Sequence, residues 1–285
     1  MCLLCYSRCA APRSPWSSRR GFVLSAGALL GAATLLPAAA QVEVGKPSSL
    51  RKLVPADTLE GAAARQYAQM LAEARAKNAL APDGHAQLGR LRAIASQLIP
   101  FAEPWNSRAR NWRWEVNLFG SKQLNAFCMP GGKIAFYSGI LDQLRLNDDE
   151  VAMIMGHEMA HALREHARER LAKTQAANIG LSLGAQLLGL GDFSGLAANL
   201  GTQLLTLKFS REDESEADLV GLELAARGGF EPRASISLWQ KMLAAGGGSS
   251  GPGFLSTHPS GPNRIHDLEA NLPKVQGLYE RARRG

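Results

Sequence analysis

The chain has 285 residues and a formal net charge of +7, from 32 basic and 25 acidic side chains. Residues 1–40 hold four of the arginines and no acid, so the remainder carries only +3, which gives no reason to expect a nucleic-acid partner. That remainder, about 245 residues, suits one domain. It keeps Cys128 alone of the four cysteines, which excludes an internal disulfide there.

The first 40 residues have the pattern of an export signal. Residues 18–24 resemble a twin-arginine signal, the apolar stretch 22–36 follows, and Ala38-Ala39-Ala40 offers an A-x-A cleavage site. Export by the general secretory route and an uncleaved anchor are the alternatives, although a membrane span needs about 20 residues. We therefore expect an exported, periplasmic protein with a linker over 41–58 and one domain over 59–285.

Two helices and three strands are expected before the middle of the chain. The helices are 59–80 and 84–98, and the strands are 112–118, 124–129 and 133–138. The first strand alternates bulky and polar side chains. The last two flank Pro130-Gly131-Gly132, a turn sequence that predicts a hairpin.

Residues 148–173 are expected to form a single helix. Asn147 is a candidate N-cap, and Glu150 three residues later completes a capping box. Neither glycine nor proline interrupts the segment after Gly156. This helix would carry the most informative motif of the chain.

That motif is His157-Glu158-Met159-Ala160-His161, an HExxH sequence. Residues four apart lie on one helical face, so both imidazoles can bind one zinc ion. Glu158 is rotated by one position and can reach a water on the metal without being a ligand. Because zinc lowers the pKa of that water to about 7, Glu158 can act as the general base.

A catalytic zinc ion usually has three protein ligands and one open position, so a third ligand is needed. Arg164 and Ala167 stand where a metzincin requires glycine and histidine. His166 lies well round the helix from His161, and we expect it to be a surface histidine. Residues 174–191 contain no acid, which excludes the spacing of thermolysin-like enzymes.

A second acidic motif begins at Ser210, which with Asp213 predicts a helix start. Glu214 and Asp218 are four residues apart and share a helical face. One of them can ligate zinc while the other holds a ligand histidine. A solvated acidic first turn is the alternative.

Two further segments stand out. Residues 176–207 carry no charge except Asp192 and are interrupted by glycine and small polar residues. A helical hairpin packed against or over the active site is expected there, with peripheral membrane contact as the alternative. Later, Thr257-His258-Pro259 follows a glycine-rich loop over 246–253.

Several short blocks together resemble a family of zinc metallopeptidases that includes CAAX-prenyl endopeptidases, HtpX-type heat-shock proteases and periplasmic quality-control peptidases of Gram-negative bacteria. Beside the HExxH motif the blocks are Asn125-Ala126-Phe127, Pro130-Gly131-Gly132, Tyr137-Ser138-Gly139, Asp149-Glu150, Ser210-Arg211, Glu214-Ser215-Glu216-Ala217-Asp218, Thr257-His258-Pro259 and Arg264-Ile265. The resemblance covers about residues 60–270. It implies an α+β, mainly α, zincin-like domain with a small sheet beside the HExxH helix.

The resemblance also implies roles for single residues. Glu214 would be the third ligand and Asp218 its support. His258 would lie near the zinc, where it binds the oxyanion or takes the fourth position, unless it is a surface turn residue. Arg264 would brace the same loop or stabilise the tetrahedral intermediate. The second strand of the hairpin, 133–138, directly precedes the zinc helix. In enzymes of this kind an edge strand beside the metal pairs with extended substrate, the alternative here being an ordinary core hairpin.

The sequence therefore predicts an endopeptidase with one Zn²⁺ per chain that hydrolyses misfolded or envelope proteins in the periplasm. Proteins or peptides are its expected partners, and this substrate class rests on the resemblance. A chaperone-like holder of unfolded envelope proteins with latent protease activity is the alternative. A third interpretation is an enzyme kept latent by His258 and the 176–207 hairpin.

Overall fold

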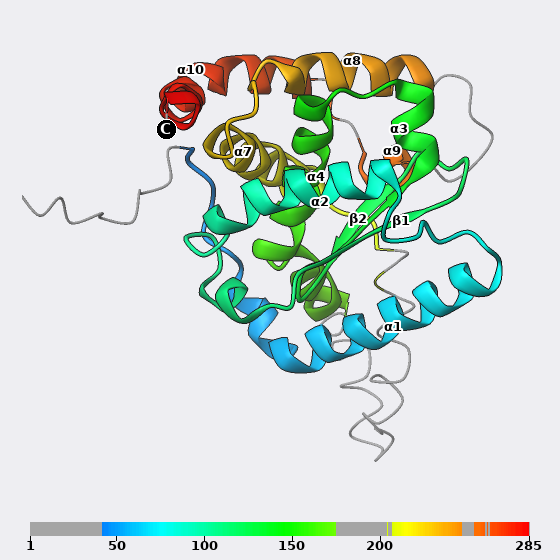
Figure 1. The fold of residues 1–285 in the computed structure, drawn as a ribbon. Coiled ribbons are helices and arrows are strands. Elements are labelled where there is room, and N and C mark those ends of the chain that lie inside the picture. The colour runs from blue at the N-terminus through cyan, green and yellow to red at the C-terminus, as the bar shows by residue number, and fades with distance from the viewer. Residues whose placement is uncertain are drawn as a thin grey trace, which may run out of the picture. The chain divides into compact units, whose positions relative to one another are not determined.

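The computed structural model describes residues 42–174, 204, 207–246, 254–259, 261 and 263–284. This part of the chain is mainly helical with one small sheet, as predicted (Figure 1). The α-helices are α1 (Ala56–Ala76), α2 (Ala86–Leu98), α3 (Ser138–Leu144), α4 (Asp148–Leu163), α7 (Arg211–Arg227), α8 (Ala234–Gly246), α9 (Phe254–Thr257) and α10 (Arg264–Arg284). The 3-10 helices are η1 (Ser49–Leu53), η2 (Ile99–Phe101) and η3 (Ser107–Asn111). The predicted export signal and nearly all of 176–207 and 246–253 lie outside the described residues.

The sheet has three strands in the order β1-β3-β2. They are β1 (Glu115–Phe119), β2 (Ala126–Met129) and β3 (Lys133–Tyr137). β2 and β3 form the predicted hairpin, and its turn needs Gly131 and Gly132 because both have positive φ. β1 pairs with β3 in parallel, which leaves β2 at one edge of the sheet. The strand next to α3 and α4 in sequence, β3, is therefore central.

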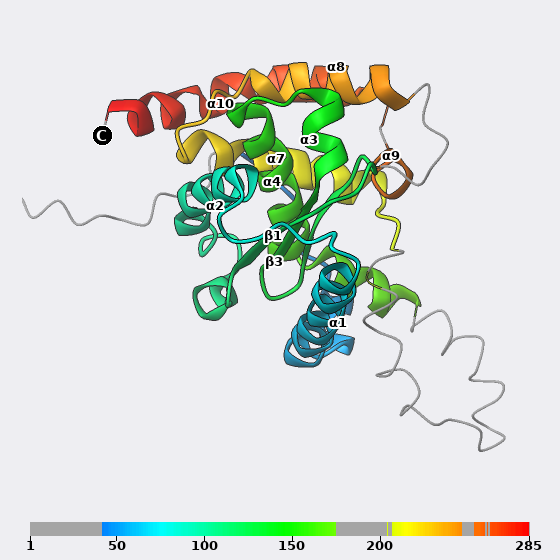
Figure 2. The same cartoon turned by 45° about the vertical axis from the view of Figure 1, so that its right-hand side comes forward.

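Helix α4 lies at the centre of the core, and its contact with α7 is unusually close. It packs against β2, α2, α7 and α8, and Figures 1 and 2 show α8 and α10 across one end of the α4–α7 pair. A Cβ added to Gly156 would lie 2.7 Å from the carbonyl oxygen of Gly221. A Cβ on Gly221 would lie 2.6 Å from the nitrogen of His157. The two glycines thus let the backbones touch, which sets the first turns of α7 against the HExxH residues.

The prediction of one helix over 148–173 is wrong at its C-terminal half. The capping box of Asn147 and Glu150 is confirmed, but α4 ends at Leu163, and residues 166–174 form a separate helical segment. Glu165, at φ 58°, makes the turn between them. Asn106, from a distant loop, donates to the Leu163 carbonyl at 3.0 Å and so satisfies one of the groups that a helix end leaves unpaired.

Several predicted boundaries also move. α1 begins at Ala56, inside the predicted linker, and β1 begins three residues later than the predicted strand. Among the helices in the described ranges, none is long and apolar enough to cross a bilayer.

Candidate metal centre

Four buried side chains converge where α4 meets α7. His157, His161, Glu214 and His258 each offer a ligand atom, and these atoms all lie within 4.8 Å of one another. The Nε2 atoms of His157 and His161 are 3.1 Å apart. Each lies 3.4 Å from an oxygen of Glu214. The Nδ1 atom of His258 is 3.0 Å from Glu214 Oε1. The structure therefore brings the three predicted ligands together with His258.

Local sequence explains how α7 presents its carboxylates. Ser210 is the N-cap, and Asp213 closes a capping box, which confirms the predicted helix start. Glu214 and Asp218 are one turn apart, and both are buried on the side that faces α4. Because Glu214 is only 3% exposed, the alternative of a solvated acidic turn does not describe it.

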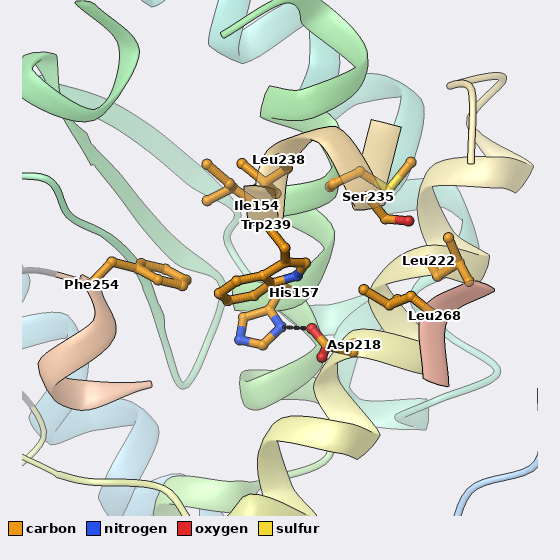
Figure 3. A pocket seen from close by; sticks show the side chains of 10 residues that line it. Ile154, His157, Asp218, Leu222, Ser235, Leu238, Trp239, Phe254 and Leu268 are labelled. Carbon is orange, nitrogen blue, oxygen red and sulfur yellow. Dashed lines mark hydrogen bonds and ion pairs between the residues drawn. The ribbon is translucent and has the colours of Figure 1, made fainter. Parts of the chain in front are cut away.

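A direct ion-pair network supports His157. Its Nδ1 atom lies 3.0 Å from Asp218 Oδ1 (Figure 3). Arg264 pairs with both oxygens of Asp218, at 2.5 and 2.8 Å, and with Glu214 at 3.1 Å. The guanidinium carbon of Arg264 lies 3.4 Å from the centre of the Trp239 ring. Arg264 therefore braces the two carboxylates of α7, a role other than the two predicted for it.

The network sets the charges of the centre. Burial favours neutral His157, yet hydrogen bonds to Asp218 and Glu214 raise the pKa of His157 to about 9. Burial likewise opposes ionisation of Glu214, but hydrogen bonds from three histidines hold the pKa of Glu214 far below its usual range. Glu214 is therefore ionised, and the imidazole of His157 is made more basic by the carboxylates around it.

A second network supports His161 and overturns the prediction that His166 is a surface residue. His166 is 2% exposed, and its Nδ1 atom lies 3.0 Å from Nδ1 of His161. Its Nε2 atom lies 3.4 Å from Glu216 Oε2, which also accepts a hydrogen bond from Arg164 Nε at 2.9 Å. The turn at Glu165 redirects the chain, so helical spacing no longer governs where His166 points.

Glu158 is not among the four residues that offer ligand atoms. Its Oε1 atom is buried and has no hydrogen-bond partner among the described residues. Burial raises the pKa of Glu158 above its ordinary value. Nε2 of His258 lies 3.6 Å from the same Oε1 atom.

Glu158 also lines a cleft of about 330 Å³ that runs along the edge strand. Its other walls come from all of β2, from the aromatic rings of Tyr137 and Phe209, and from His258. The lining is mostly apolar. Neither the Arg264 nor the Trp239 side chain contributes to its described lining. An extended chain lying along β2 would therefore pass Glu158 and the histidine cluster.

The residues present fit a zinc ion. Imidazole nitrogen and carboxylate oxygen are ligand atoms that zinc takes, and three protein ligands leave a catalytic position open. Asp218 holds the second nitrogen of His157, as ligand histidines usually require. His166 and Glu216 lie outside the group of four donors.

Sequence reasoning missed three residues around this centre. Two of them carried a weak indication in the sequence, since His166 closely follows the HExxH motif and Glu216 lies within the block that contains Glu214 and Asp218. Trp239 carried none, because it lies within α8, in no motif.

An HExxH helix whose histidines meet a glutamate from a second helix is the arrangement of zincin-like metallopeptidases. The sequence profile of Peptidase family M48 matches residues 86–272, and the chain belongs to this family.

Curated relatives of this chain carry peptidase names. The mitochondrial metalloendopeptidase OMA1 of Schizosaccharomyces pombe is 39% identical over 166 residues, which are 58% of this chain and 48% of the relative. OMA1 of Saccharomyces cerevisiae is 34% identical over 184 residues, 62% of this chain and 52% of the relative. The β-barrel assembly-enhancing protease of Escherichia coli K12 is 30% identical over 171 residues, 56% of this chain and 35% of the relative. The match thus spans about half of these relatives or less.

These names correct the predicted location. The two fungal relatives are mitochondrial proteins, so the prediction of an exported, periplasmic protein is wrong. The composition of residues 1–40 explains the error. Mitochondrial targeting segments are also rich in arginine and serine and poor in acid, so this composition does not distinguish the two.

Proposed function

We propose that the chain is a zinc-dependent endopeptidase that cleaves extended segments of unfolded proteins. The observation that carries the proposal is the buried cluster of His157, His161 and Glu214, of which His161 lines the cleft along β2 together with Glu158. The cluster would hold one Zn²⁺ per chain, with Asp218 orienting His157. Zinc in such a site supplies Lewis-acid chemistry, which activates water near neutral pH and polarises a peptide carbonyl.

Glu158 would move the protons of the reaction. It would take a proton from the attacking water and deliver it to the leaving amine. Its buried Oε1 atom supports this role, since it accepts no hydrogen bond from the described residues. Its raised pKa also brings the carboxyl closer to the neutral range in which a general base works.

Misfolded proteins are the substrate class we propose, without assigning a compartment. A strand at the edge of a sheet can add an extended peptide through main-chain hydrogen bonds, which requires the peptide to be unfolded there. β2 occupies the edge, and its residues line the cleft. The apolar walls favour side chains that a folded protein would bury.

Glu158→Gln tests the chemistry. An amide cannot accept the proton of water, so we expect casein cleavage to fall by about 10²–10⁴-fold while zinc content stays at one per chain. Glu212→Gln is a matched control, because Glu212 is an exposed acid on the first turn of α7. Cleavage by the Glu158 variant near the wild-type rate would remove Glu158 from the mechanism.

The apolar cleft also favours a second candidate, a chaperone-like holder of unfolded proteins. The two candidates differ in what Glu158→Gln does to cleavage and to aggregation. A holder would suppress the aggregation of an unfolded client equally well in both proteins, and the wild type would show no zinc-dependent cleavage. An endopeptidase would release new peptide ends that the variant does not release.

The position of His258 supports the proposal that this residue controls access to the open metal position. It contacts Glu214 at 3.0 Å and lies 3.6 Å from Glu158, so it can compete for the open metal position. If it does, His258→Ala raises basal cleavage and weakens zinc binding slightly. If it stabilises the oxyanion instead, the same change lowers turnover and leaves zinc binding unaltered. Cleavage rate and zinc affinity of this one variant separate the two, and no change in either would exclude both.

A further inference from the structure

We infer that His166 and Glu216 are positioning residues that fix the ring of His161 so that its Nε2 atom faces the metal. The inference rests on the proposed function, because it assumes that His161 is a ligand. Neither residue touches the reacting atoms. Both would act through His161, by a relay that runs from His161 to His166, Glu216 and Arg164.

The hydrogen-bond geometry allows one proton arrangement when His161 binds metal. A ligand imidazole is neutral, so if Nε2 faces the metal the proton of His161 lies on Nδ1. That N–H points at Nδ1 of His166, 3.0 Å away, which must then accept. The single proton of neutral His166 therefore lies on Nε2. This atom faces Glu216 Oε2 at 3.4 Å, and a carboxylate can only accept.

The far end of the relay is anchored by charge. Arg164 donates to Glu216 Oε2 at 2.9 Å and to the backbone carbonyl of Gly45. The Arg164 side chain is only 7% exposed, whereas that of Glu216 is 25% exposed. Glu216 Oε2 thus faces the Arg164 guanidinium on one side and His166 Nε2 on the other, which is the position of the acceptor that the relay requires.

The break in α4 builds this relay. Had the helix continued past Leu163, His166 would lie well round it from His161. The turn places Arg164 and His166 so that both contact Glu216. Phe209 stacks on the ring of His161, with centroids 4.0 Å apart, so the ring is held by packing as well as by its hydrogen bond. Both ring nitrogens of His166 are engaged, which packing alone would not require.

Three variants of the chain test the relay. His166→Phe keeps a ring but removes the acceptor, and His166→Asn keeps an acceptor oxygen near the position of Nδ1. Glu216→Gln keeps the shape of the side chain and removes its charge. Zinc affinity is measured by competition with a chelator, and the thermal unfolding midpoint is measured on the zinc-free proteins. Visible absorption of the Co²⁺-substituted proteins reports the ligand geometry.

We expect His166→Phe to weaken zinc binding about 10- to 100-fold, the usual effect of losing a partner of a ligand histidine. His166→Asn should recover most of the loss, and Glu216→Gln should weaken binding several-fold. The Co²⁺ spectrum should change in the phenylalanine variant more than in the asparagine variant. The exposed-acid variant Glu212→Gln should bind zinc as the wild type does.

Two results would overturn the inference. One is wild-type zinc affinity in both His166→Phe and Glu216→Gln. The other is a loss of affinity in His166→Phe that the asparagine variant does not recover and that follows the stability of the zinc-free protein. If His166→Phe does not fold, Glu216→Gln decides alone. Failure of the proposed function looks different, because the wild type would then bind no zinc and His157→Ala would change nothing.

Discussion

The two histidines of the HExxH motif are held in different ways. His157 contacts the carboxylate of Asp218 directly. Arg264 pairs with that carboxylate and lies over the ring of Trp239. His161 meets a second histidine, and only beyond His166 does a carboxylate follow. The first network is buried throughout, with side chains no more than 8% exposed, whereas the second ends on a quarter-exposed glutamate.

The difference follows from the geometry of α7. A straight helix presents one face to α4, and residues four apart share it, so Glu214 and Asp218 both reach the centre. Glu216 is two residues from each and points about 200° away from Glu214. A carboxylate in that position contacts the centre only through an intermediary. The early end of α4 supplies it by turning His166 back toward His161.

Removing Asp218, the direct partner of His157, should have the largest effect on stability and on zinc affinity. Asp218→Ala leaves the buried guanidinium of Arg264 with Glu214 as its remaining carboxylate among the described side chains and removes the partner of His157. We expect the free energy of unfolding to fall by about 3 kcal/mol or more, the cost of leaving a buried charge short of its partner. Zinc affinity should fall about 100-fold.

Denaturant unfolding and chelator competition measure these two quantities. The same measurements on His166→Phe give the comparison, because that variant removes one partner from the other histidine. If Asp218→Ala lost less zinc affinity than His166→Phe, the direct carboxylate partner of His157 would not be the stronger of the two supports.

The part of the centre that depends on local spacing was predictable. A cap at Asn147, two histidines four apart and a cap at Ser210 each follow from interactions within a few residues of the chain. Such interactions are nearly the same in any protein that contains the pattern. They were enough to predict the helices that carry His157, His161 and Glu214, and the hairpin beside them.

The part that depends on contacts between distant segments was not predictable. No glycine or proline marks the end of α4. The helix stops because Asn106 satisfies the Leu163 carbonyl and Glu216 holds Arg164, and these partners are more than 50 residues away. The burial of His166 follows from that stop. The parallel pairing of β1 with β3 is likewise a tertiary contact that strand periodicity cannot reveal.

A change at Trp239, which packs against Arg264, should have an intermediate effect. Trp239→Leu keeps an apolar side chain but removes the ring over which Arg264 lies. We expect the free energy of unfolding to fall by about 2 kcal/mol, because the cation–π contact and the packing of the ring are lost. Zinc affinity should fall only a few-fold because Asp218 remains. The comparison would fail if Trp239→Leu weakened zinc binding as much as Asp218→Ala, since the ring would then be the true support of His157.

The smallest effect is expected from a change at Glu150, in the first turn of α4. Glu150 accepts from the Asn147 nitrogen at 3.0 Å and from Ser237 at 2.8 Å, and it pairs with Lys241 at 2.7 Å. Glu150→Gln keeps the shape and removes the charge, which should cost about 1 kcal/mol of stability. Zinc affinity should not change, because Glu150 contacts neither histidine network. A loss of affinity here would show that general weakening of α4, and not the two networks, governs the metal site.

The pH dependence of that small effect has a definite sign. Burial opposes ionisation of Glu150, but Lys241, the Asn147 backbone and Ser237 lower the pKa of Glu150 below its ordinary value. A carboxyl whose pKa is lower in the folded state stabilises the fold above its unfolded pKa of about 4.3, and this stabilisation is lost as the pH falls through the folded value. The stability difference between wild type and Glu150→Gln, measured without zinc by denaturant unfolding, should therefore be constant from about pH 7 to 5 and shrink below about pH 4. A difference that stays constant through the acid range would mean that Glu150 acts by shape alone, and that its charge does not hold α4 against α8.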